Sequence, residues 1–97
     1  MDDKKIEMYI TVGKVVAAKD NGNYPEGEKH AILAYAKATS HSEAEVIMAK
    51  ELAKGGWVNI EFHKIGTIDP LKQKADSNLQ TAIETGFSAV IYTGVEP

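Results

Sequence analysis

The sequence predicts an α+β domain in which a four-stranded mixed sheet carries two helices on one face, as a two-layer sandwich. Four segments have the apolar pattern of strands and two have the apolar period of helices. They follow one another as strand, strand, helix, strand, helix, strand, an order that lets the helices cover one face of the sheet. The chain has 97 residues, 43% hydrophobic and 26% charged, which is the size and composition of a single domain covering residues 1–97.

The first strand is expected between Ile6 and Ala18, because apolar and polar side chains alternate there with a period of two. The alternation breaks at Gly13 and Lys14, which indicates a bulge. Residues 19–29 read KDNGNYPEGEK and collect turn-forming residues. They predict a long, acidic hairpin loop.

The second and third strands are expected over residues 30–39 and 57–64. One face of the second strand carries only small side chains and an isoleucine, so a helix can approach it closely. The third strand alternates apolar and polar residues, which is typical of a strand with one solvated face. We expect the third strand at an edge of the sheet.

The first helix is expected to begin in the segment TSHSEAEV, which is unusually dense in reactive side chains. Ser40 and Glu43 have the spacing of a capping box, and Ser42 and Glu45 repeat it. Strong helix formers follow, up to a double glycine that ends the helix. We therefore interpret this cluster as a helix start, with His41 solvated beside the cap.

The second helix is expected to begin at Asp69–Pro70, since aspartate is a good N-cap and proline fits the first helical position. It is expected to end at Gly86, after one apolar stripe formed by Leu71, Ala75, Leu79, Ala82 and Ile83. The last segment, FSAVIYTG, is apolar enough to form a strand that is buried on both faces or central in the sheet.

The connections predict the strand directions. Right-handed crossovers are expected to make strands two, three and four parallel, with the first strand antiparallel through its hairpin. Placing the apolar fourth strand in the middle gives the spatial order 1-2-4-3. The sheet face without helices is then open to water or to a partner, and Tyr9, Tyr35 and Tyr92 are expected on it.

No catalytic residue, metal site or cofactor is predicted. The chain has no cysteine, which excludes disulfides and thiolate metal sites and suits a reducing compartment. His30, His41 and His63 match no spacing of metal ligands and are interpreted as separate surface or strand-end residues. The glycine-rich phosphate-binding motifs and the G-x-S-x-G elbow of hydrolases are absent from the sequence.

The charge and hydropathy of the chain limit the kinds of partner that it is expected to bind. Eleven basic and 14 acidic residues give a net charge of -3, which repels phosphate backbones and favours a basic protein partner over nucleic acid. The charged start and the interrupted apolar run after it predict neither a signal peptide nor a membrane span. We expect a cytoplasmic protein that acts without a membrane.

The run SHSEAEVIMAKELAKGGWVNIEF, with its EAE...A..L...GW pattern, resembles the small immunity proteins of bacterial contact-dependent growth inhibition systems. The order of the elements is similar as well. The resemblance implies a cytoplasmic, non-enzymatic protein that binds one cognate toxin, often a nuclease, and covers its active site. These families share no catalytic motif, so the resemblance assigns no functional residue.

The candidate partner-binding surface combines the acidic loop with the open face of the sheet. Carboxylates on the loop would attract a basic toxin and speed its association. Tyrosines beside charged groups are common in protein interfaces. The candidate residues are Asp20, Tyr24, Glu26, Glu28, Tyr35, Glu61 and His63.

An alternative function is a small homo-oligomeric enzyme or ligand-binding protein with a site near Glu61 and His63. These residues are two apart on the third strand, so they are expected to share a face and to be able to exchange protons. The first helix is apolar over a wide arc, which fits packing on neighbouring elements or on a second subunit. A homodimer therefore remains compatible with the sequence.

Overall fold

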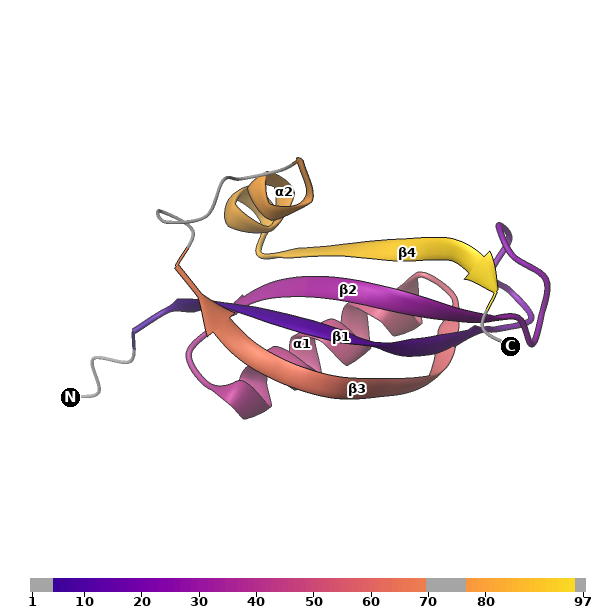
Figure 1. Cartoon of the computed structure of the whole chain (residues 1–97), viewed down its shortest axis with the longest axis horizontal. Coiled ribbons are helices and arrows are strands. Elements are labelled where there is room, and N and C mark those ends of the chain that lie inside the picture. Colours follow the sequence, from indigo (N-terminus) through magenta and orange to yellow (C-terminus); the bar gives the residue numbers. More distant parts are fainter. Residues whose placement is uncertain (1–4, 70–76, 96–97) are drawn as a thin grey trace.

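The computed structural model describes residues 5–69 and 77–95 and confirms the predicted α+β class and order of elements. A hairpin of two long strands comes first, and each later strand follows a helix (Figure 1). The elements are β1 (Glu7–Ala17), β2 (Lys29–Ala38), α1 (His41–Lys54), β3 (Trp57–Ile68), α2 (Ser77–Thr85) and β4 (Phe87–Val95).

The sheet is antiparallel throughout, with the order β3-β1-β2-β4. The predicted parallel strands and the predicted order 1-2-4-3 are therefore wrong. The parallel directions were expected from right-handed crossovers, and the order from placing the apolar fourth strand between strands two and three. The predicted neighbours β1–β2 and β2–β4 are confirmed, but β3 pairs with β1 rather than with β4. β3 lies at an edge as predicted, whereas β4 lies at the other edge instead of in the middle.

One side of the sheet, called the α1 side here, packs against α1. Ala44 and Met48 of the helix are fully buried against Tyr9 and a stripe of alanines on β2. This stripe is the small face predicted from the sequence, and it lets the helix lie close to the sheet. In Figure 1, α1 lies behind β1 and β2. The alanines of the stripe are Ala34, Ala36 and Ala38.

The second helix covers the opposite side, called the α2 side, so the prediction of two helices on one face is wrong. Leu79 and Ala82 pack against Met8 and Tyr35, which alternate with the residues that face α1. Both sides of the central strands carry apolar residues, and each side therefore needs its own cover. The helix α2 is short and covers only the end of the sheet near the start of β4 (Figure 1).

The first helix begins with the predicted capping box. The Glu43 amide donates to Oγ of Ser40 at 3.1 Å, and Oε1 of Glu43 accepts from the Thr39 amide at 2.9 Å. The serine thus satisfies one orphan amide of the helix, while the Glu43 carboxylate binds the amide of Thr39, one residue before the N-cap Ser40. His41 is exposed, as expected, and its ring lies 3.6 Å from the carboxylate of Glu45.

The described part of the second helix ends at Gly86, as predicted, where a φ of 96° favours glycine. The amide of Gly86 donates to the carbonyl of Ala82 at 2.8 Å and closes the last turn. The predicted start at Asp69–Pro70 and the stripe positions Leu71 and Ala75 involve residues 70–76, which lie outside the described residues.

The pairing of β1 with β3 shifts register twice, between Val12 and Gly13 and again before Val16. The break predicted near Gly13 is confirmed. A side chain at Gly13 would overlap the backbone carbonyl oxygen of Glu61, so only glycine lets the two strands approach here.

Candidate partner-binding surfaces

The hairpin loop between β1 and β2 is held by the side chain of Asn21, which is 8% exposed. Its Nδ2 donates to the carbonyl of Gly56 at 2.8 Å, in the turn between α1 and β3. Its Oδ1 accepts from the amides of Asn23 at 3.2 Å and Tyr24 at 3.1 Å. An asparagine that bonds the backbone two and three residues ahead fixes a turn, so this half of the loop has a defined conformation.

The loop docks closely on the rest of the chain. The amide of Ala18 also donates to the Gly56 carbonyl, at 2.9 Å. Gly56 has a φ of 89°, and a Cβ there would lie 2.6 Å from the Cα of Asn21. The glycine is therefore required both by its backbone conformation and by the close approach of the loop.

An aromatic cluster of Tyr24, His30 and Trp57 supports the other half of the loop. The ring centroids lie 4.5 Å apart for Tyr24 and His30, 5.3 Å for Tyr24 and Trp57, and 5.8 Å for His30 and Trp57. His30 is fully buried and Trp57 is 6% exposed. Of the two positions expected for this histidine, surface or strand end, His30 lies near the start of β2 and not on the surface, because its ring is covered by residues from distant parts of the chain.

Both ring nitrogens of His30 face oxygen atoms. Nδ1 lies 2.7 Å from the carbonyl oxygen of Tyr92, and Nε2 lies 2.7 Å from Oε1 of Glu28. Because a carbonyl only accepts, Nδ1 donates to it. This pair of bonds ties the loop to β4.

Four of the candidate residues lie in the loop, two of them exposed to solvent and two half-buried against the rest of the chain. Asp20 and Glu26 are exposed and project from a loop whose backbone is fixed. Tyr24 and Glu28 are half-buried and belong to the support, through the aromatic cluster and the bond to His30. The surface that the loop offers to a partner is therefore its exposed carboxylates.

The part of the α2 side beyond α2 is the open face of the sheet. Among the residues whose burial is described, five large hydrophobic ones are exposed, and three of them lie on this face by strand register and alternation: Val12 at 45%, Val58 at 44% and Tyr92 at 47%. Charged side chains of Lys14, Lys64 and Glu61 lie among them.

The structure moves two tyrosines away from the open face. Tyr35 is 7% exposed and packs under α2 with Met8 and Leu79. Tyr9 is 8% exposed and packs on the α1 side. The expected position of Tyr35 in a partner surface is therefore wrong, because α2 covers the end of the sheet that was predicted to be open.

Glu61 and His63 are both exposed on β3. Phe62 pairs with Gly13 and Lys64 with Val12, so His63 is the additional residue at a register shift.

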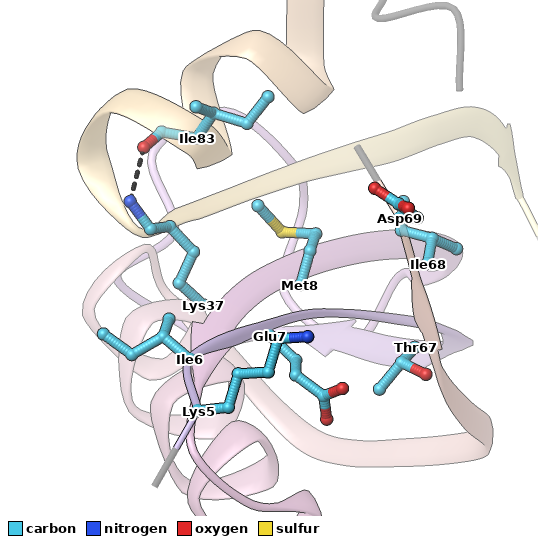
Figure 2. Close-up of a pocket in the computed structure, with 9 residues that line it drawn as sticks. All are labelled: Lys5, Ile6, Glu7, Met8, Lys37, Thr67, Ile68, Asp69 and Ile83. Atoms are coloured by element: carbon cyan, nitrogen blue, oxygen red, sulfur yellow. Dashed lines mark hydrogen bonds between the residues drawn. The ribbon is translucent and has the colours of Figure 1, made fainter. Parts of the chain in front are cut away.

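A cavity of about 610 Å³ lies instead beside α2, at the end of the sheet where β1 begins and β3 ends (Figure 2). Met8, Ile68 and Ile83 form apolar walls, and Lys37 donates from Nζ to the carbonyl of Ile83 at 2.7 Å. Charged side chains of Lys5, Glu7, Lys37 and Asp69 also line the cavity. The other lining residues are Ile6 and Thr67.

Within residues 5–69 and 77–95, no cluster of histidine, cysteine and carboxylate side chains has the geometry to hold a metal ion. In the same part of the chain, no helix is long and apolar enough to cross a membrane. Comparison with protein-family models, curated proteins and solved structures gives no match.

Sequence reasoning missed the two residues that organise the loop, Asn21 and His30. The run NGNY carried a usable signal for Asn21, since an asparagine at the start of a turn often bonds the backbone ahead of it. The burial of His30 had no local signal, because Trp57 and Tyr92 reach it from other strands.

Proposed function

We propose that this protein is a non-catalytic, immunity-type binding protein that acts in the cytoplasm and neutralises a basic protein toxin through its β1–β2 hairpin loop. The observation that carries the proposal is the fixed loop that presents Asp20 and Glu26 to solvent. The loop spans residues 18–28, which is longer than the roughly two to five residues usual in a β-hairpin, and it is held by side-chain bonds and aromatic packing.

A fixed loop supports tight binding for an energetic reason. Ordering a flexible loop on binding costs free energy, and a loop that is already ordered avoids that cost. The exposed carboxylates then act mainly on the rate of association and on its salt dependence. The resemblance to immunity proteins supports a toxin as the partner, and the overall charge of -3 supports a basic one.

The test is affinity capture from a lysate of the source organism with three immobilised proteins. These are the wild type, the loop variant Asp20→Lys/Glu26→Lys, and a control variant Glu45→Lys/Glu84→Lys with the same change in charge. All four residues are exposed, and the control residues lie on α1 and α2. Tyr35→Ala is unsuitable as a test, because Tyr35 is buried and its loss would disturb the packing under α2.

We expect the wild type and the control to retain one basic protein in equal amounts, and the loop variant to lose it. The captured protein should be toxic or degradative by itself and inactive in the complex. Raising the salt concentration should slow its association with the wild type. Equal retention by the loop variant would contradict the proposed surface, and capture of a protein whose activity is unchanged in the complex would contradict neutralisation.

A second candidate function, binding of a small molecule, is favoured by the cavity beside α2. Its apolar walls with charged groups at the margin fit an amphipathic ligand. In a fragment screen followed by NMR, we expect binders to shift the methyl resonances of Met8, Ile68 and Ile83. Chemical shift changes confined to Glu61 and His63 would instead favour a ligand site at these two residues, the alternative predicted from the sequence.

A further inference from the structure

The last strand has a sequence suited to the middle of a sheet but lies at an edge. From Phe87 to Val95 it contains no charged residue and no proline. Ser88 is buried, but the apolar side chains are half-buried or exposed on both sides of the sheet. Those on the α1 side are Phe87, Ala89 and Ile91, and those on the α2 side are Val90 and Tyr92.

The other edge strand, β3, shows how an edge is protected. Its pairing with β1 shifts register twice, and Asn59 has a φ of 49°. It also carries exposed Glu61 and Lys64. Bulges and charges of this kind prevent another strand from pairing with an edge.

The edge of β4 has none of these features over its first half. Its pairing with β2 is regular from Phe87 to Ile91, and its only register shift lies after Ile91. β4 has a hydrogen-bonded neighbour on one side alone within the described residues. Its outer edge therefore offers straight, unpaired backbone groups beside half-buried apolar side chains, which is a template for another strand.

We propose that β4 pairs with β4 of a second copy of this chain, antiparallel across a two-fold axis, to form one continuous eight-stranded sheet. Two identical edge strands related by a two-fold axis are antiparallel, so the same surface serves both copies. Because β4 carries no charge, the pairing places no like charges opposite each other.

The second copy accounts for the composition of β4. In the dimer, β4 occupies the centre of the sheet, and its apolar side chains on both sides contact their counterparts across the axis. The same pairing through β3 would put Glu61 and Lys64 into the seam, where the bulges also misalign the backbone. The observations on the two edges therefore select β4.

The test measures the molar mass of the full chain by light scattering over a range of concentrations. We expect the wild type to reach twice the monomer mass of 10.5 kDa. Val90→Lys and Tyr92→Lys should each return the mass to that of the monomer, since both place lysines near the seam. Val58→Lys is the matched control, because Val58 lies on the same side of the sheet in the other edge strand, and it should remain dimeric.

A second measurement locates the contact. The chain has no cysteine, so a single cysteine at Ser88, Val90 or Tyr92 reports on the seam, with Val58→Cys as the control. We expect oxidation to link two chains for at least one of the β4 cysteines and not for Val58→Cys. A wild type that stays monomeric over the whole range overturns the proposal, as does a dimer that survives both β4 lysines. Because the loop is untouched, Val90→Lys should still capture the partner of the loop.

Discussion

Replacing His30 with phenylalanine should destabilise the protein through lost hydrogen bonds while keeping an aromatic ring in the cluster. The ring of His30 packs beside Tyr24 and Trp57, and phenylalanine fills a similar space. The two bonds at 2.7 Å, to the Tyr92 carbonyl and to Glu28, disappear together. The Tyr92 carbonyl then faces an apolar ring in place of the fully buried imidazole, whereas the Glu28 side chain is 25% exposed and in contact with water.

The expected loss follows from the two bonds. The bond to the carbonyl contributes about 1 kcal/mol, and a bond to a charged group about 1.5–3 kcal/mol. The free energy of unfolding should therefore fall by about 2.5–4 kcal/mol when both bonds are lost, a large part of the roughly 5–15 kcal/mol typical of a small domain. For a chain of this size, the midpoint of thermal unfolding should fall by at least about 8 °C.

The assay is urea unfolding followed by fluorescence and by circular dichroism. Trp57 is the only tryptophan in the chain and lies in the same cluster, so its emission reports directly on this region. His41→Phe is the control, because the side chain of His41 is 60% exposed, and it should change the unfolding free energy by less than about 0.5 kcal/mol. If His30→Phe is no more destabilising than His41→Phe, the two bonds do not stabilise the fold.

Three further substitutions test the backbone and the cap by the same unfolding assay. Gly13→Ala should lower the free energy of unfolding by about 2 kcal/mol or more, since its methyl group would overlap the Glu61 carbonyl. Gly66→Ala should lower it by less, because nothing lies within 4 Å of a Cβ at that position. Equal losses of stability would refute the close approach of the two strands at Gly13. Gly56→Ala should lower the free energy of unfolding more than Gly27→Ala, because both glycines have a positive φ but only Gly56 lies against Asn21. The opposite ranking would contradict the docking of the loop on Gly56. Ser40→Ala should cost about 1 kcal/mol through the lost cap, and Ser42→Ala, one residue inside the helix start, should cost clearly less.

Local features of this fold could be predicted from the sequence. The capping box at Ser40 and Glu43 and the helix end at Gly86 depend on a few neighbouring residues. The alanine stripe on β2 follows from the alternation of side chains along the strand. The break in the pairing of β1 with β3 lies at Gly13, which interrupts the alternating pattern in the sequence. Each of these was predicted because its cause lies within a few positions of the chain.

The arrangement of the strands could not be predicted in the same way. Whether β3 pairs with β1 or with β2 depends on contacts between segments far apart in sequence, and the alternating pattern of β3 suits either neighbour. Tyr35 has the same pattern whether its face is open or covered, so its burial under α2 required the position of that helix. His30 is similar, because its second acceptor belongs to Tyr92 on β4.

The order of the strands has a consequence for synthesis of the chain on the ribosome. β1 and β2 form the centre of the sheet and are joined by a hairpin, so they can pair as soon as both have been made. The outer edge of β2 has to wait for β4, the last element of the sheet to emerge. Until then β2 exposes unpaired backbone along its full length, which is a state prone to aggregation. Nascent or truncated chains that lack residues 87–95 therefore carry an unpaired edge on β2 and need protection from aggregation.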